Sequence, residues 1–161
     1  MTFFRLYETP VKLIRPFNVY GPRLRLDDRR VIPDFLSDAL NRRPITVRSD
    51  GRVTRSFCYV VDFVIAAILL LTEGEPGEAY NVGNADEVTI RAVAETVDEI
   101  SGGTLGVSFE ASEDPDYLTD NPSRRSPDLT KTQAAIDWAP EVNLRDGLRR
   151  CYEHYVEEGS Q

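Results

Sequence analysis

The sequence predicts one α/β unit, because short β-type runs alternate with segments of helical periodicity. Residues 11–14 and 79–82 are apolar runs of strand length, and each is followed by a glycine-containing turn. Apolar side chains recur at helical spacing over residues 31–40, 61–71 and 90–100. We therefore expect strands and helices to alternate along a single unit that spans residues 1–161.

The first part of the chain is expected to bring a strand to the rim of a sheet. Residues 1–7 are aromatic-rich and have the character of the end of a helix, which Thr9-Pro10 closes. The strand at residues 11–14 leads into Arg-Pro-Phe-Asn-Val-Tyr-Gly-Pro-Arg at residues 15–23. Ligands of open α/β sheets bind at the carboxyl ends of the strands. This nonapeptide is therefore either a ligand-binding rim or an ordinary strand end followed by a turn.

Capping residues support the remaining elements. We expect helices over residues 31–40, 61–71, 90–100 and 131–136 and from residue 144 onward, and short strands at residues 45–47, 79–82 and 107–109. Pro33 suits the first turn of a helix, and Asp62 places a carboxylate where it suits the helix dipole. Thr89 is a plausible N-cap. Asn143 with Asp146 three residues later forms a capping box for the last helix.

Composition and charge narrow the classes of function. The chain is 41% hydrophobic and 29% charged, with a formal net charge of -8. A net acidic protein is a poor ligand for polyanions, so we expect no nucleic-acid partner. No run approaches the roughly 20 apolar residues that span a bilayer, and the N-terminus lacks a signal-peptide pattern. We therefore expect a soluble, cytoplasmic protein with no membrane partner.

The sequence has too few cysteine and histidine residues to indicate a metal site. Cys58 and Cys151 are far apart and show no paired spacing, which favours neither a metal site nor a disulfide framework. His154 is the only histidine. We therefore name no metal ligand.

Arginine dominates the basic residues. All but two of the 19 are arginine, which is a better phosphate ligand than lysine, although genome composition produces the same bias. The acidic segment at residues 110–120 is interpreted as a solvated surface loop.

Six motifs occur in order along the chain. They are the nonapeptide at 15–23, Val-Ile-Pro at 31–33, Thr-Arg-Ser-Phe-Cys-Tyr-Val-x-Asp at 54–62, Tyr-Asn-Val-Gly-Asn at 80–84, Arg-Ser-Pro-Asp at 125–128 and Trp-x-Pro at 138–140. In this order and spacing they resemble the C-terminal half of extended short-chain dehydrogenases/reductases that act on nucleotide sugars. The likeness is greatest to UDP-glucuronate decarboxylases, with sugar-nucleotide 4,6-dehydratases and 4-epimerases close behind.

The resemblance implies an incomplete Rossmann-type portion plus a small C-terminal α/β substrate domain. Residues 11–22 and 61–84 would form the last Rossmann strands and helix, and residues 23–60 and 85–161 would form the substrate-binding domain. The complete enzymes of this family hold NAD and oxidise the sugar transiently at C4, in lyase or isomerase reactions.

The resemblance also implies roles for single residues near the rim. Asn18 would contact the sugar diphosphate, and Gly21 with Pro22 would pass near the nicotinamide of NAD. Val31 and Ile32 would present backbone groups to the nucleotide base.

Three arginines complete the implied substrate site. Arg55 and Arg125 would bind the diphosphate, and two guanidiniums converging from distant segments suit bidentate recognition of that group. The alternative is that they form local ion pairs with Asp62 and Asp128. Arg48 stands where similar proteins usually have an aromatic residue beside the nucleotide ring. It either stacks on the base through its guanidinium plane or faces solvent. The resemblance therefore leaves the base open, and we expect a UDP- or dTDP-linked sugar.

Two features of the family are missing. The glycine-rich cofactor turn lies between a strand and a helix, whereas the glycine cluster at residues 102–106 follows a helix and precedes a strand. No tyrosine is followed by lysine four residues later, so the catalytic Tyr-x-x-x-Lys is absent. We expect no catalytic residue, no NAD bound by this chain alone and no redox chemistry.

These observations favour the nucleotide-sugar-binding portion of an NAD-dependent epimerase, dehydratase or decarboxylase. Isolated Rossmann strands would expose unpaired edges, so an N-terminal Rossmann partner chain or a homo-oligomer is expected to cover them. The alternative is a stand-alone, non-catalytic nucleotide-sugar-binding protein, or a degenerate homologue that self-associates.

Overall fold

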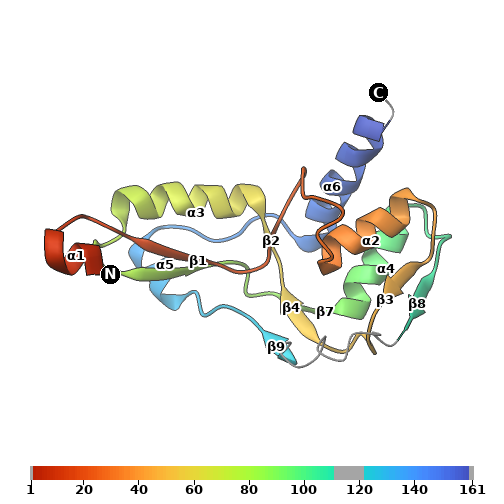
Figure 1. Cartoon of the computed structure of the whole chain (residues 1–161), viewed down its shortest axis with the longest axis horizontal. Helices are drawn as coiled ribbons and strands as arrows, with labels where there is room; N and C mark the ends of the chain where they lie inside the picture. The colour runs from red at the N-terminus through yellow and green to blue at the C-terminus, as the bar shows by residue number, and fades with distance from the viewer. Residues whose placement is uncertain (1, 111–121, 160–161) are drawn as a thin grey trace.

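The computed structural model describes residues 2–110 and 122–159, which form two adjoining lobes (Figure 1). The helices are α1 (Thr2–Tyr7), α2 (Val31–Leu40), α3 (Val60–Glu73), α4 (Ile90–Ile100), α5 (Thr130–Ala135) and α6 (Leu144–Gly159). The strands are β1 (Leu13–Pro16), β2 (Val19–Tyr20), β3 (Ile45–Val47), β4 (Thr54–Ser56), β5 (Cys58–Tyr59), β6 (Ala79–Val82), β7 (Glu87–Thr89), β8 (Val107–Phe109) and β9 (Arg124–Arg125). The mixed α/β class predicted from the sequence is confirmed.

The first lobe is built on the parallel pair β1–β6, whose register runs from Leu13 opposite Ala79 to Pro16 opposite Val82. Helix α3 lies along this sheet (Figure 1). Ala66 and Leu70 of α3 are fully buried in one apolar cluster with Tyr80 and Val82 of β6. Burial of these side chains fixes α3 to one face of the sheet.

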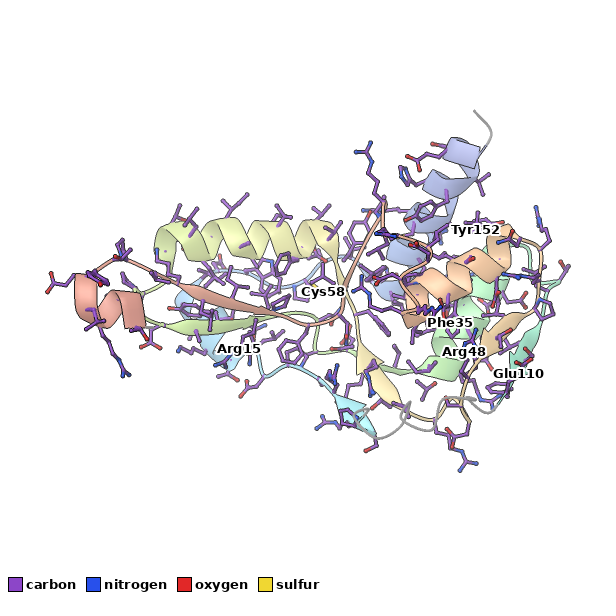
Figure 2. The ribbon with its side chains drawn as sticks, in the orientation of Figure 1. Arg15, Phe35, Arg48, Cys58, Glu110 and Tyr152 are labelled. Atoms are coloured by element: carbon purple, nitrogen blue, oxygen red, sulfur yellow. The ribbon has the colours of Figure 1, made fainter. Side chains whose placement is uncertain are left out.

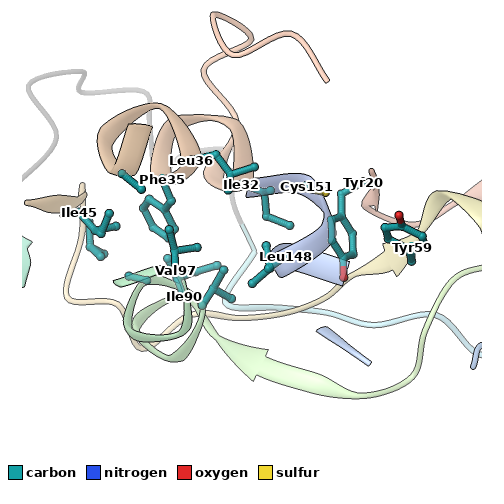
Figure 3. Close-up of a cluster of buried hydrophobic side chains, with 14 residues drawn as sticks. Tyr20, Ile32, Phe35, Leu36, Ile45, Tyr59, Ile90, Val97, Leu148 and Cys151 are labelled. Atoms are coloured by element: carbon teal, nitrogen blue, oxygen red, sulfur yellow. The ribbon is translucent and has the colours of Figure 1, made fainter. Parts of the chain in front are cut away.

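The second lobe is helical and holds the larger core. Helices α2 and α4 pack against the parallel pair β3–β8, and α6 packs on α2 and α4. Figure 3 shows side chains such as Leu36, Val97 and Leu148 converging from the three helices, and these three are fully buried. Between the lobes, β4 pairs with β7 antiparallel and with β9 parallel, while β2 pairs with β5 parallel.

The helix predictions hold closely where the periodic segment is long. Helices α2 and α4 have the predicted bounds, and α3 extends the predicted range by one residue at its start and two at its end. The Thr89 hydroxyl caps α4 by accepting the Ala92 N–H at 3.1 Å. Asn143 Oδ1 accepts the Asp146 N–H at 2.9 Å, and the Asp146 carboxylate accepts the Asn143 side-chain amide at 2.7 Å. The second bond of this capping box therefore uses a side-chain donor instead of the backbone donor.

The strand predictions were less accurate. The first strand is Leu13–Pro16, two residues later than predicted, because pairing with β6 begins at Leu13 and the Val11 carbonyl accepts the Gly77 N–H instead. Several two- and three-residue strands had no predicted counterpart, namely β2, β4, β5, β7 and β9. Such strands are too short to show a period of two. The acidic loop lies outside the described residues from residue 111 onward.

Asp62 lies in the first turn of α3, as predicted, and it also bonds to a distant segment. The residue is buried, and its carboxylate accepts the Val142 N–H at 3.1 Å. It therefore ties α3 to the segment that precedes α6. No helix within the described ranges is long and apolar enough to cross a membrane.

Tyr20 joins the two lobes. Its side chain is 3% exposed and packs edge-on against Phe57 and Tyr59, with ring centroids 6.3 and 5.7 Å away. Its hydroxyl donates to the Leu144 carbonyl at 3.3 Å. The ring lies over Gly147, where a Cβ atom would come within 2.1 Å of the Tyr20 hydroxyl oxygen. Helix α6 can approach β2 this closely only because residue 147 has no side chain.

Replacing Gly147 with alanine should destabilise the protein. Overpacking a core costs roughly 1–3 kcal/mol, which exceeds the gain of up to about 1 kcal/mol from replacing glycine by alanine in a helix. We expect Gly147→Ala to lower the free energy of unfolding in urea by about 1–2 kcal/mol. Gly159→Ala, in the same helix but with nothing within 4 Å of the new Cβ, should leave it unchanged or slightly raised. Equal effects of the two substitutions would contradict the close contact.

Candidate functional site

A cavity of about 260 Å³ opens where β2, the start of α2, β4 and β9 meet. Its polar lining is Asn18, Arg29, Arg30, Arg55 and Arg125, and its apolar lining is Val19, Tyr20, Leu24, Val31, Ile32, Pro33 and Phe57. Apolar walls with a few convergent polar groups are typical of small-molecule sites. Four arginines among the lining residues favour an anionic ligand.

Asn18 is held firmly at the rim. Its backbone is in the left-handed region, with φ of 41°. The side-chain amide donates to the Ser56 carbonyl at 2.7 Å, and the Asn18 carbonyl accepts the Cys58 N–H at 3.2 Å. A second amide hydrogen and the amide oxygen remain for a ligand. The strained conformation is therefore stabilised by β4 and β5, which also form the cavity wall.

Arg55 and Arg125 face the cavity from neighbouring strands. The parallel register of β9 on β4 places Arg125 directly opposite Arg55. Arg55 is 7% exposed and donates to the Thr54 carbonyl at 2.6 Å, whereas Arg125 is exposed. Both arginines line the cavity, so their side chains are available to one anionic ligand from adjacent strands.

The predicted alternative, local ion pairs with Asp62 and Asp128, has no support. Among the described ion pairs, neither carboxylate joins an arginine. The Asp62 carboxylate accepts a backbone N–H, as described above, and the Asp128 carboxylate accepts the Thr130 N–H at 2.9 Å. Hydrogen bonds from the Thr130 side chain, the larger cause, and from the Thr130 backbone lower the pKa of Asp128.

The start of α2 forms another wall of the cavity. Arg30 is the N-cap residue, but its side chain makes no capping hydrogen bond and instead pairs with Asp28. Without a side-chain cap, the first backbone N–H groups of the helix have no intrahelical partner. Val31 and Ile32 both line the cavity, so the predicted site for backbone contacts to a nucleotide base lies at this wall.

Seven lining residues were not predicted as site residues, namely Val19, Tyr20, Leu24, Arg29, Arg30, Pro33 and Phe57. Arg29 has φ of 54°, a left-handed conformation that is unusual for a residue with a side chain. Arg29 and Arg30 could have been predicted as site residues, because they come immediately before Val31 and Ile32 at the start of a helix. Phe57 belongs to the motif at residues 54–62. It lies between the end of β4 and the start of β5, so the side to which its ring points cannot be read from strand alternation.

Gly21, Pro22 and Arg48 are not among the residues that line the cavity. Gly21 is buried, and a Cβ there would lie 2.4 Å from Val60 Cγ1, so packing against α3 requires glycine. Arg48 is exposed on the loop after β3, and Figure 2 shows it at the β3–β8 end of the molecule. Burial raises the pKa of Asp34, and the Arg48 guanidinium opposes this shift. The cofactor role of Gly21 and Pro22 and the base contact of Arg48 stay predictions.

The lining side chains are suited to binding. The arginines and Asn18 supply hydrogen-bond donors, and the apolar wall excludes water. Burial, the largest cause, raises the pKa of Tyr20 far above its ordinary value, so its hydroxyl stays protonated. Within residues 2–110 and 122–159, no three His, Cys, Asp or Glu side chains gather in a metal-binding arrangement.

Comparison with known proteins assigns the chain to a family. The model of the NAD dependent epimerase/dehydratase family matches residues 2–83, just over half of the chain. The chain belongs to the NAD-dependent epimerase/dehydratase family. This family includes the group that the sequence motifs resemble.

Curated relatives extend the likeness beyond residue 83. UDP-glucuronic acid decarboxylase 5 of Arabidopsis thaliana is 37% identical over 146 residues, which cover 91% of this chain and 41% of the relative. UDP-glucuronic acid decarboxylase 1 of Xenopus tropicalis is 33% identical over 150 residues, covering 92% of this chain and 34% of the relative. The chain thus spans about a third to two fifths of the decarboxylases it matches.

Solved structures share the fold over nearly the whole chain. An epimerase from Methanothermobacter thermautotrophicus matches with a TM-score of 0.89 and 30% identity, covering 99% of this chain and 47% of that protein. UDP-glucuronic acid 4-epimerase from Bacillus cereus, solved with UDP-glucuronic acid and NAD, matches with a TM-score of 0.84 and 26% identity, covering 98% and 48%. The chain therefore corresponds to about half of these enzymes.

The Arg55–Arg125 pair predicts that pyrophosphate stabilises the protein. At about 100 times its Kd, a ligand adds about 2.7 kcal/mol, which raises the Tm of a chain this long by roughly 5–10 °C. Arg125→Gln should remove most of this shift in a thermal melt while changing stability without ligand by less than about 0.5 kcal/mol. Arg124→Gln is the matched control, because Arg124 pairs with Glu87 away from the cavity. A pyrophosphate shift that both variants retain would exclude the arginine pair as the anion site.

Proposed function

We propose that this chain is the nucleotide-sugar-binding portion of an NAD-dependent epimerase, dehydratase or decarboxylase. The opposed pair Arg55 and Arg125 at the cavity carries the proposal, because two adjacent guanidiniums match the two phosphates of a sugar nucleotide. Asn18 contributes a third donor from the rim. The named decarboxylases and the epimerase solved with UDP-glucuronic acid support UDP-glucuronate as the first ligand to test.

The rest of the cavity suits the other parts of such a ligand. The uncapped start of α2 offers the N–H groups of Val31 and Ile32 to the acceptor atoms of a base. Arg29 and Arg30 add positive charge beside them. This arrangement accommodates a UDP- or dTDP-linked sugar, with the base at α2 and the diphosphate between β4 and β9.

The residues present do not form a complete site for NAD. The only glycine cluster follows α4 and precedes β8, whereas a dinucleotide turn opens a helix after a strand. Gly21 is packed against Val60, so Gly21 and Pro22 would provide at most one flank of a nicotinamide site. We therefore assign this chain no redox step of its own and propose that a Rossmann half supplies NAD and the catalytic Tyr-x-x-x-Lys.

The open edge of β1 supports completion by another Rossmann half. The N–H groups of Leu13 and Phe17 bond to β6, so the intervening Ile14 N–H points away from it. No strand pairs with that edge within residues 2–110 and 122–159. The opposite edge of the sheet is closed, because the Asn81 carbonyl accepts the Thr132 hydroxyl at 2.6 Å. A parallel strand could therefore join this sheet only at β1.

Calorimetric titration tests the binding function directly. We expect the purified chain to bind UDP-glucuronate and not NAD. Arg55→Ala and Arg125→Ala should each weaken sugar-nucleotide binding by about 2 kcal/mol, or about 30-fold in Kd, because each loses charged hydrogen bonds. Arg124→Ala is the control, because Arg124 precedes Arg125 in β9 and its side chain pairs with Glu87.

Two outcomes would contradict the binding function. One is the absence of sugar-nucleotide binding by a folded chain. The other is an equal loss in the Arg124→Ala control, which would indicate a general charge effect instead of a diphosphate site.

Hydrogen exchange tests the open edge. The Ile14 amide should exchange much faster than the Phe17 amide in the isolated chain, because only the latter is bonded to β6. The Ile14 amide should become protected when a Rossmann-bearing chain copurifies. Equal protection of the two amides in the isolated chain would show that the edge is already covered. Binding without any such copurifying chain would favour the stand-alone binding protein.

A further inference from the structure

Residues 23–30 form a loop between β2 and α2, here called the cavity loop. Three of its members, Leu24, Arg29 and Arg30, line the cavity. The backbone is left-handed at Arg23 and Arg29, with φ of 67° and 54°, and this conformation is unfavourable for residues with a side chain. A loop of this kind keeps its course only when neighbouring elements hold it in place.

Helix α6 holds the cavity loop through Tyr155. The Tyr155 hydroxyl donates to the Leu24 carbonyl at 2.5 Å, and the loop lies beside α6 (Figure 1). Burial, the largest cause, raises the pKa of Tyr155, so the hydroxyl keeps its proton and remains a donor. Because Leu24 directly follows Arg23, the bond acts next to one of the two left-handed residues.

We propose that Tyr155 is a positioning residue of the sugar-nucleotide site, which acts through the cavity loop. Tyr155 itself is not among the residues that line the cavity. Its effect reaches the ligand through Arg29 and Arg30, which come immediately before the α2 wall. The proposed function places the nucleotide base at that wall, so the inference rests on the proposed function.

The two ends of the site are held by different parts of the protein. Helix α6 supports the cavity wall at Gly147, which receives the Tyr20 ring, and about 12 Å further along at Tyr155. The diphosphate end instead belongs to β4 and β9, and β4 is held by β7. Loss of the Tyr155 bond should therefore disturb the base end of the site and leave the diphosphate end unchanged.

Calorimetric titration of two ligands tests this division. Tyr155→Phe removes the hydroxyl and keeps the ring. We expect it to weaken binding of UDP-glucuronate about fivefold, which corresponds to one net hydrogen bond, and to leave binding of pyrophosphate unchanged. Tyr152→Phe is the matched control and should change neither affinity. Tyr152 lies about one turn earlier on α6, is also partly buried against the core, and its hydroxyl has no hydrogen bond within residues 2–110 and 122–159.

Limited digestion of the ligand-free chain with trypsin tests the tie between α6 and the loop separately from binding. The cavity loop carries exposed arginines at positions 23, 25, 29 and 30. Cleavage at these sites reports how often the loop opens. Tyr155→Phe should raise the cleavage rate there about fivefold, whereas Tyr152→Phe should be cleaved like the unaltered chain.

Three results would overturn the positioning role alone. The first is an unchanged affinity of Tyr155→Phe for UDP-glucuronate when the unaltered chain binds it. The second is an equal loss of affinity for UDP-glucuronate and pyrophosphate together with faster cleavage throughout the chain, which would indicate general destabilisation. The third is an equal effect of Tyr152→Phe. A folded, unaltered chain that does not bind UDP-glucuronate would overturn the proposed function and the positioning role with it.

Discussion

The contact between the Tyr20 ring and Gly147 is the constraint on which the lobes and the cavity depend. Tyr20 belongs to β2, which pairs with β5 just before α3 begins, so its position affects the first lobe. The same ring packs on α6 of the second lobe and forms part of the cavity wall. Because the contact leaves no space for a Cβ at residue 147, the distance between α6 and β2 is fixed. The shape of the cavity is therefore a consequence of core packing.

The cavity combines features that weaken the protein without a ligand. Asn18 and Arg29 hold left-handed backbone conformations, and Arg55 lies opposite Arg125. Backbone strain of this kind concentrates at functional sites. The surrounding sheet is stabilised by other residues, because Arg124 pairs with Glu87, and Glu87 also accepts the Thr54 hydroxyl at 3.2 Å. Arg124 thus helps to hold β9 to β7 and β4, while the next residue, Arg125, lines the cavity.

The first lobe has two uncovered surfaces of different character. The β1 edge offers backbone groups in the plane of the sheet, and the outer side of α3 offers apolar side chains above it. A further strand would bond to the backbone groups of the β1 edge, and a further helix would cover the apolar side chains of α3. Relatives of the family are two to three times as long as this chain, which agrees with an edge made for further strands.

The sequence by itself determined the family, the long helices, the caps of α4 and α6, and five of the residues that line the cavity. Helices α2 and α4 were predictable because more than two turns of apolar periodicity and a capping residue such as Thr89 are local properties. Strands of two or three residues, such as β4 and β9, were not, because they exist only through pairing with distant segments. The same pairing decided the site. Arg55 and Arg125 are 70 positions apart, and only the register of β9 on β4 places them opposite each other. Tertiary packing also added Arg29 and Arg30 to the cavity and left Arg48 outside it, because the direction of a loop side chain depends on the elements against which the loop packs.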